Sequence, residues 1–330
     1  MTQHLPFEFL GTGTYVPQRV FTNHHFVERL DTTDDWIVSR TGIRERRCAA
    51  PDEWTSTMAA QAAELALEDA GLKATDLDLI VCATATGDCP FPASATFLQA
   101  AIGAEGVPAF DVNAACAGFL YATLTTASLL WAGPYRYALV VGAETLTRFA
   151  DAEDRGTCIL FGDAAGAAVV RRSEDPEQGI LYHEIGCDGN RAELIWLPAG
   201  GSRLPATQTT VDERLHYMKM RGREVYKFAV IKLEELIDNA LQATGLTPDD
   251  LKLIIPHQSN LRIIESARAR LGLPREKVAV NIDRYGNTSA ASIPMALDEA
   301  RRNGTLEKGD LVLMVAIGAG MAWATMILRL

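Results

Sequence analysis

The fold of this chain is decided by a stretch that occurs twice: residues 71–82 read GLKATDLDLIVC, and residues 245–256 read GLTPDDLKLIIP. Six of the twelve positions are identical at a constant offset of 174 residues (245 − 71). In each copy the pattern predicts an amphipathic helix before the match, over about 57–70 and 224–243, and an apolar strand at its end. The chain therefore contains two related α/β units.

The correspondence continues beyond this stretch. An apolar strand is predicted at 137–142 and has a counterpart at 309–314. Each half then closes with a Gly/Ala-rich turn, at 161–166 and at 317–320. Ordered matches at nearly one offset indicate a duplication, so we expect an α/β fold of two halves packed face to face. The predicted halves are residues 1–175 and 176–330.

Cys116 lies in the run AACAGF at 114–119, at the turn between two predicted elements. Residues 107–112 indicate a strand, and residues 117–131 indicate an apolar helix that a Gly-Pro pair ends. A thiol at a helix N-terminus faces unsatisfied N–H groups, which lower its pKa from about 8.5. This placement predicts a nucleophile that takes up an acyl group, although intracellular cysteines are also common as buried core residues.

The apolar helix after Cys116 has to be weighed as a membrane span, because no charged residue occurs between Asp111 and Arg136. Gly118, the four threonines or serines of the helix and the strand before it favour a buried core helix instead.

Two more residues are expected beside the cysteine. His257 follows the apolar strand at 253–256, so it lies at the end of a sheet strand where α/β proteins place their chemistry. An offset of about 171 carries Cys116 onto Asn287, in the run RYGNTSA at 284–290. Equivalent loops of two halves related by a pseudo-twofold axis meet at the centre of a molecule. Cys116, His257 and Asn287 are therefore predicted to share one site, and a satisfied core histidine is the alternative for His257.

Composition excludes several function classes. The chain has 330 residues, of which 48% are hydrophobic and 22% are charged, as in an ordinary globular enzyme. Its net charge of −11 argues against nucleic acid or an anionic membrane as the main partner. The six cysteines include no C-x-x-C pair, so neither a disulfide framework nor a metal site is expected, and a reducing cytoplasm fits best. No secretory signal pattern occurs at the start.

Four motifs carry a resemblance to a known family: DDWIVSRTGIRER at 34–46, DVNAACAGF at 111–119, PHQSN at 256–260 and RYGNTSAAS at 284–292. In this order they resemble 3-ketoacyl-acyl-carrier-protein synthase III, a condensing enzyme of the thiolase superfamily, and the likeness runs from Gly11 to the C-terminus. The resemblance implies a thiolase-like, five-layer αβαβα fold and a homodimer.

The resemblance also implies the chemistry. Cys116 matches the nucleophile that accepts an acyl group from acyl-CoA. His257 and Asn287 match the pair of neutral donors that binds the malonyl thioester carbonyl and promotes decarboxylation. Condensation with malonyl-acyl-carrier protein then gives a 3-ketoacyl product and initiates fatty-acid synthesis. No cofactor is expected beyond the CoA and phosphopantetheine thioesters that serve as substrates.

The acyl oxyanion is expected to bind to the backbone N–H groups of Cys116 and Ala319. This chain departs from the family pattern there, because Ala319 stands where glycine is usual and Ile317 stands where phenylalanine is common. A backbone N–H survives this change, but alanine is strained if the loop needs a positive φ.

Further positions match the substrate tunnel of the family. Trp36 and Arg155 match a pair that sandwiches adenine, Arg40 matches a phosphate-side contact, and Asn260 lines the pantetheine path. Phe91 matches a residue that limits the acyl chain from across the dimer interface. The alternative interpretations are that Trp36 is a core tryptophan and that Arg155 is a surface arginine.

Two basic patches interrupt the acidic chain, at 214–227 and 262–277. Lys227 and Arg262 match positions implicated in docking of the acidic carrier protein, although a solvated helix face would also carry such charges.

Other functions stay open at this point. Relatives with a comparable Cys and His catalyse acyl transfer, head-to-head condensation of fatty acyl-CoAs, or polyketide and quinolone assembly. Asn287 favours malonyl decarboxylation over thiolase and acyltransferase chemistry. A papain-like cysteine hydrolase also uses Cys, His and Asn, but the duplicated α/β chain argues against it. A catalytically silent partner subunit is disfavoured because all three catalytic positions are intact.

Overall fold

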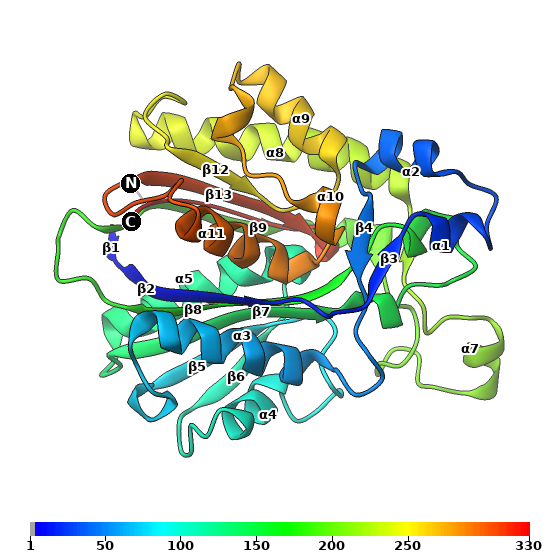
Figure 1. Cartoon of the computed structure of the whole chain (residues 1–330), viewed down its shortest axis with the longest axis horizontal. Helices are drawn as coiled ribbons and strands as arrows, with labels where there is room; N and C mark the ends of the chain where they lie inside the picture. The colour runs from blue at the N-terminus through cyan, green and yellow to red at the C-terminus, as the bar shows by residue number, and fades with distance from the viewer. Residues whose placement is uncertain (1–3) are drawn as a thin grey trace.

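The computed structural model describes residues 4–330 and has five layers, in the order helix, sheet, helix, sheet, helix (Figure 1). The first sheet has the strand order β2 (Glu8–Tyr15), β8 (Asp163–Arg171), β7 (Tyr137–Thr145), β5 (Leu79–Ala83), β6 (Ala109–Val112). The second has the order β1 (Leu5–Pro6), β9 (Gly179–Cys187), β14 (Ala322–Arg329), β13 (Leu311–Gly318), β12 (Leu253–Pro256). This is the thiolase-like fold that the sequence predicted.

The two sheets are built alike. In the first, β5 pairs in parallel with β6 and β7, while β8 is antiparallel to β7 and β2. In the second, β12 and β13 are parallel, while β14 is antiparallel to β13 and β9. The boundary expected after residue 175 lies in the connection between β8 and β9. Strand β1 belongs to the N-terminal half in sequence. Leu5 and Pro6 nevertheless pair with β9, so β1 forms part of the second sheet.

Two helices, α5 (Gly118–Ala132) and α11 (Ser292–Arg302), form the layer between the sheets. Among the described residues one stretch, Ala115–Ala132, is apolar and long enough to be a candidate membrane span. Its residues join one hydrophobic core with strands of both sheets. A helix covered by a sheet on each side needs an apolar surface all round, which explains its composition.

Helices α3 (Thr55–Ala70) and α4 (Ser94–Ala101) cover the outer face of the first sheet. Helices α8 (Gly222–Thr244) and α9 (Leu261–Arg270) cover the outer face of the second. Gly11 of β2 allows the closest of these contacts, because a Cβ at that position would lie 2.3 Å from the Ala70 nitrogen of α3.

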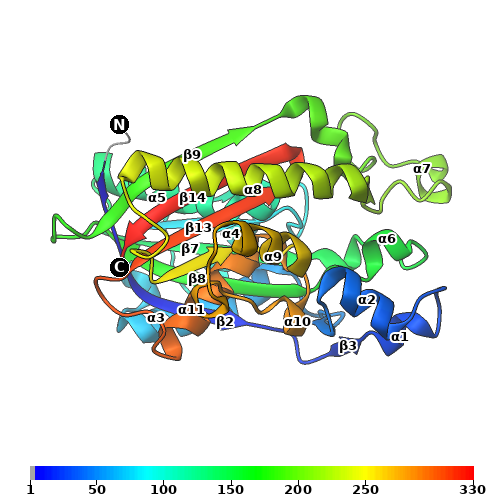
Figure 2. The ribbon, with the colours of Figure 1, turned by 90° about the horizontal axis from the view of Figure 1, so that it is seen from above.

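Shorter elements gather at one end of the molecule, beyond the ends of the parallel strands (Figure 2). They are β3 (Val20–Thr22), α1 (His24–Val27), α2 (Asp34–Thr41), β4 (Glu45–Arg47), α6 (Arg155–Cys158), β10 (Ile195–Trp196), α7 (Gln208–Asp212), β11 (Lys219–Met220) and α10 (Ile282–Tyr285).

The structure corrects the residue equivalence between the halves. A 3-10 turn at Ala115–Ala117 precedes α5, and a 3-10 turn at Ser289–Ala291 precedes α11, at an offset of 174 (289 − 115). The first residue of each turn has φ 47. Cys116 is therefore equivalent to Ala290 and not to Asn287, because the positive-φ residue fixes the register of each turn. The two loops do meet, since the two 3-10 turns are in contact.

Candidate active site

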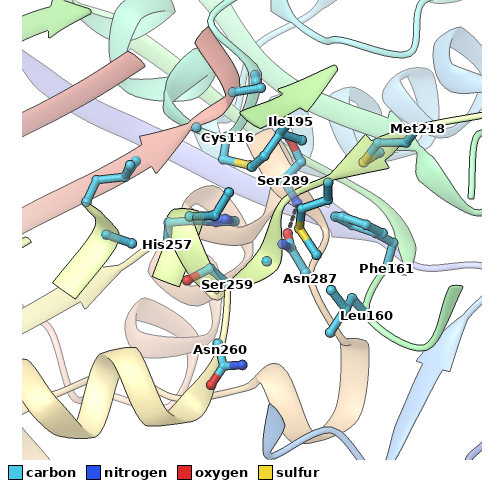
Figure 3. Close-up of a pocket in the computed structure, with 18 of the residues that line it drawn as sticks. Cys116, Leu160, Phe161, Ile195, Met218, His257, Ser259, Asn260, Asn287 and Ser289 are labelled. Carbon is cyan, nitrogen blue, oxygen red and sulfur yellow. Dashed lines mark hydrogen bonds between the residues drawn. The ribbon is translucent and has the colours of Figure 1, made fainter. Parts of the chain in front are cut away.

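A cavity of about 1090 Å³ lies at the end of the molecule where the short elements gather, and both halves line it. Cys116, His257 and Asn287 all reach this cavity, with Trp36 and Arg155 elsewhere in its wall. Figure 3 shows the three side chains arranged around one space. The structure thus brings together the three residues that the sequence singled out.

Cys116 is the second residue of the turn between β6 and α5. Burial raises the pKa of its thiol to about 12, although the Ser289 hydroxyl and the Cys116 backbone N–H act in the opposite direction. The sequence predicted a lowered pKa from the helix N-terminus, and the structure differs because desolvation of the thiolate outweighs these hydrogen bonds. Cys116 is therefore a thiol at neutral pH and needs a proton acceptor when it reacts.

His257 directly follows β12, and its backbone N–H donates to the Val315 carbonyl at 2.8 Å. The ring is buried, and burial lowers its pKa to about 3, so it is neutral at physiological pH. Nδ1 lies 2.7 Å from the Ser292 hydroxyl, whereas Nε2 has no hydrogen-bond partner among the described residues. Nε2 is the ring atom left for a substrate.

The hydrogen bonds of Ser292 select the tautomer of His257. The Ser292 hydroxyl donates to the Ser289 carbonyl at 2.9 Å and has only one hydrogen. With the hydroxyl in this orientation, Nδ1 carries the proton in the bond to Ser292, and the lone pair on Nε2 can accept a proton. With the hydroxyl turned to donate to Nδ1, the ring takes the other tautomer and Nε2 is the donor that the sequence predicted.

Asn287 is held at both backbone groups and at its side chain. Its N–H donates to the Leu160 carbonyl at 2.8 Å, and its carbonyl accepts from the Gly162 N–H at 3.0 Å. Its Oδ1 accepts from the Ser289 N–H at 2.9 Å, a bond drawn in Figure 3. Because Oδ1 is engaged, the amide presents Nδ2, which makes no hydrogen bond among residues 4–330, as a donor to the cavity.

Ser289 and Glu144 were missed by the sequence analysis. The Ser289 hydroxyl donates to the Glu144 carboxylate at 2.9 Å, which joins the second half to the end of β7 in the first. Glu144 is fully buried and also accepts from the Thr86 hydroxyl at 2.5 Å and the Ala85 N–H at 3.1 Å. Burial raises its pKa. The available signal was a single acid inside the apolar run YALVVGAET at 137–145.

The loop after β13 brings its backbone against the nucleophile. A Cβ on Gly318 would lie 2.7 Å from the Cys116 nitrogen, so only glycine fits there. The positive φ of this loop, 119°, is at Gly320, and Ala319 is not among the positive-φ residues. The departure from glycine at Ala319 therefore causes no backbone strain. Ile317 and Ala319 both line the cavity.

At the mouth, the Arg155 guanidinium lies 4.8 Å from the ring centroid of Trp36. Arg40 and Asn260 also line the cavity. The Asn260 side chain is partly committed, since Oδ1 caps α9 at the Arg262 N–H and Nδ2 donates to the Arg40 carbonyl at 3.0 Å.

Three predicted residues lie outside the cavity lining. Phe91 is 85% exposed, on a loop that the cavity of this chain does not include. Lys227 and Arg262 are both exposed. The Arg262 guanidinium lies 5.7 Å from the ring centroid of Tyr226, a cavity residue, so Arg262 borders the cavity.

Comparisons with known proteins agree with this geometry. The family model described as 3-oxoacyl-(acyl-carrier-protein) synthase III matches residues 110–189, and the model of its C-terminal part matches residues 241–330. A β-ketoacyl-(acyl-carrier-protein) synthase III of Caldanaerobacter subterraneus subsp. tengcongensis is 48% identical over 100% of this chain and 99% of its own length. One from Symbiobacterium thermophilum is 49% identical over 98% of each chain.

Solved structures give the same result. The 3-oxoacyl-(acyl-carrier-protein) synthase III of Aquifex aeolicus superposes with a TM-score of 0.90 at 45% identity, covering 98% of this chain and 100% of its own. A priming β-ketosynthase of a polyketide pathway superposes with a TM-score of 0.90 at 36% identity, covering 100% of this chain and 98% of its own.

Proposed function

Because this chain belongs to the 3-oxoacyl-(acyl-carrier-protein) synthase III family, we propose that Cys116, His257 and Asn287 perform the reaction of that family. The enzyme is an acyltransferase that forms a C–C bond, and its reaction is the condensation that initiates fatty-acid synthesis. The observation that carries the proposal is the convergence of a thiol, an unpartnered imidazole nitrogen and an oriented amide on one cavity.

Acylation comes first. The Cys116 sulfur attacks the thioester carbonyl of acyl-CoA, and the N–H groups of Cys116 and Ala319 bind the oxyanion. Since the thiol is protonated at neutral pH, its proton moves to His257 Nε2 and then to the sulfur of the departing CoA. The products are the acyl-enzyme and free CoA.

Condensation follows with malonyl-acyl-carrier protein. Loss of CO2 builds charge on the thioester oxygen, which accepts hydrogen bonds from Asn287 Nδ2 and His257 Nε2. Nε2 donates at this stage from the tautomer in which Nδ1 accepts from the Ser292 hydroxyl. The ring reaches that tautomer by taking up one proton from water at Nε2 and releasing the one on Nδ1 to water before the malonyl thioester binds, with no net change of charge. The carbanion attacks the carbonyl carbon of the acyl group on Cys116. The bond between that carbon and the Cys116 sulfur breaks, and the thiolate takes up one proton per turnover.

The mouth of the cavity fits the two substrates. Trp36 and Arg155 stack on the adenine of CoA, Arg40 meets its phosphates, and the apolar lining receives pantetheine. Exposed Lys227 and Arg262 attract the acidic carrier protein. Phe91 packs against a second copy of the chain in a homodimer, which gives this exposed aromatic ring a partner.

A specialised pathway is the second candidate, because the polyketide priming synthase has the same fold. The curated relatives at 48% and 49% identity favour fatty-acid initiation over it.

The test is intact-protein mass after exposure to acyl-CoAs of graded length and then to malonyl-acyl-carrier protein. We expect an adduct on Cys116 that is consumed to give a 3-ketoacyl product, and no adduct in Cys116→Ala. Asn287→Ala should retain the adduct and lose CO2 release. His257→Ala should form the adduct only slowly, because it lacks the acceptor of the thiol proton, and should also lose CO2 release. An adduct passed on or hydrolysed without loss of CO2 would assign the chain to the acyltransferase relatives instead.

A further inference from the structure

Arg46, in β4, is the largest fully buried side chain of the described residues. It makes no ion pair among residues 4–330, and burial lowers its pKa to about 10. Its guanidinium donates to the Phe21 carbonyl at 3.1 Å, to Asn23 Oδ1 at 2.8 Å and to the Ile159 carbonyl at 2.6 Å. A buried cation without a carboxylate is costly, so its position invites a functional explanation.

One arm of this network holds the helix that carries Trp36. Asn23 receives a hydrogen bond from Arg46 at Oδ1 and donates from Nδ2 to the Asp34 carboxylate at 2.8 Å and the Ile43 carbonyl at 2.9 Å. Asp34 is the first residue of α2, and Ile43 follows its C-cap. Arg46 therefore fixes both ends of α2 through a single amide.

The other arm holds the helix that carries Arg155. Ile159 is the C-cap of α6, so the guanidinium bonds the carbonyl directly after that helix. The next residue, Leu160, accepts the hydrogen bond of the Asn287 N–H at 2.8 Å. Arg46 thus connects α2, α6 and the loop of Asn287 through these hydrogen bonds.

The side chain of Arg46 also packs against the glycines around Asn287. Cβ atoms placed on Gly162 and Gly286 would lie 3.1 Å and 3.2 Å from the Arg46 Cβ. No side chain other than hydrogen fits these two positions without moving Arg46 or the neighbouring backbone carbonyls.

We propose that Arg46 is a positioning residue that fixes the backbones of α2 and α6, so that Trp36 and Arg155 form a preorganised clamp for the nucleotide of CoA. With both backbones held, only the two side chains have to move to admit a planar base, which lowers the entropy cost of binding. The inference rests on the proposed function, because it requires that acyl-CoA binds between these two groups.

The test compares acylation by an acyl-CoA and by the matching acyl-pantetheine, which lacks the nucleotide, in Arg46→Lys and Asn23→Ala. We expect KM for the acyl-CoA to rise about tenfold in both variants, the factor for the loss of one or two hydrogen bonds. Acylation by the acyl-pantetheine should keep its wild-type kcat/KM. Arg47→Lys is the matched control, since Arg47 contacts Glu45 and the Pro17 carbonyl but neither clamp helix.

Equal losses with both thioesters, or no loss with either, would overturn the proposal, because a merely structural role does not distinguish them. If Arg46→Lys fails to fold, Asn23→Ala decides alone. The wild type separates this inference from the proposed function. No acylation by either thioester would reject the function, whereas equal kcat/KM for the two would reject only the clamp.

Discussion

Asn113 and Asn287 lie 174 residues apart and make the same hydrogen bond. Asn113 Oδ1 accepts from the Ala115 N–H at 3.2 Å, and Asn287 Oδ1 accepts from the Ser289 N–H at 2.9 Å. Each bond supports a residue with φ 47, which opens the turn into a helix of the middle layer. The two loops have kept one backbone geometry, and each uses a different residue of it for chemistry.

In the first loop the residue after the positive-φ position is the nucleophile Cys116, and in the second it is Ala290, whose Cβ lies close to Gly118. The second loop instead exposes the amide of Asn287 to the cavity. The duplicated turn therefore supplies the acyl acceptor from the first half. From the second half it supplies the proposed hydrogen-bond donor to the enolate oxygen.

The loop after β13 gives the first prediction. Gly318→Ala would place a Cβ 2.7 Å from the Cys116 nitrogen and 2.9 Å from the Ala114 carbonyl oxygen. We expect the acylation rate of Cys116, measured by intact mass, to fall about 100-fold, the cost of misplacing a reacting group by an ångström. Ala319→Gly is the control and should acylate close to the wild-type rate. A normal rate in Gly318→Ala would show that this contact does not shape the site.

The second prediction concerns Ser292. Ser292→Ala removes the partner of His257 Nδ1 and leaves a buried polar atom unsatisfied, at a cost of about 1–3 kcal/mol in the free energy of unfolding. CO2 release from malonyl-acyl-carrier protein should slow about 100-fold, because the ring loses the hydroxyl that sets its tautomer. Ser128→Ala on α5, whose hydroxyl bonds only its own helix, should leave both quantities unchanged.

The third concerns stability and pH. His257 has its pKa lowered from 6.5 to about 3 by burial, so between these values the unfolded chain binds a proton that the folded chain does not. Stability is then full above pH 6.5 and falls as the pH drops, by up to about 1.4 kcal/mol per pH unit from this group. In His257→Gln, chemical denaturation between pH 6.5 and 5 should show a smaller decrease in the free energy of unfolding than in the wild type. Parallel curves for the two proteins would mean that His257 titrates normally.

The sequence predicted the elements well where one pattern repeats. Helices expected at 117–131 and 224–243 occur at Gly118–Ala132 and Gly222–Thr244, because the apolar run of the first, the amphipathic pattern of the second and their flanking glycines are local signals. The placement of Cys116 and His257 at strand ends also followed from local patterns. These features need no knowledge of distant contacts.

Other features depended on distant contacts and could not be predicted. The bond between Ser289 and Glu144 joins residues 145 positions apart, and no motif marks such a pair. The equivalence of Cys116 and Asn287 was wrong because a positive φ at Ala115 is not visible in an alanine. The pKa of Cys116 was predicted in the wrong direction because burial of the thiol depends on the whole fold.

That pKa supplies the last prediction. A thiol with a pKa near 12 is almost entirely protonated at pH 8, so its alkylation by iodoacetamide should be slow there. The rate should keep rising through pH 10 without a plateau, because each pH unit adds tenfold more thiolate. A plateau with a midpoint below pH 8 would mean that the N-terminus of α5 outweighs burial, in which case Cys116 reacts as a preformed thiolate and needs no proton transfer to His257.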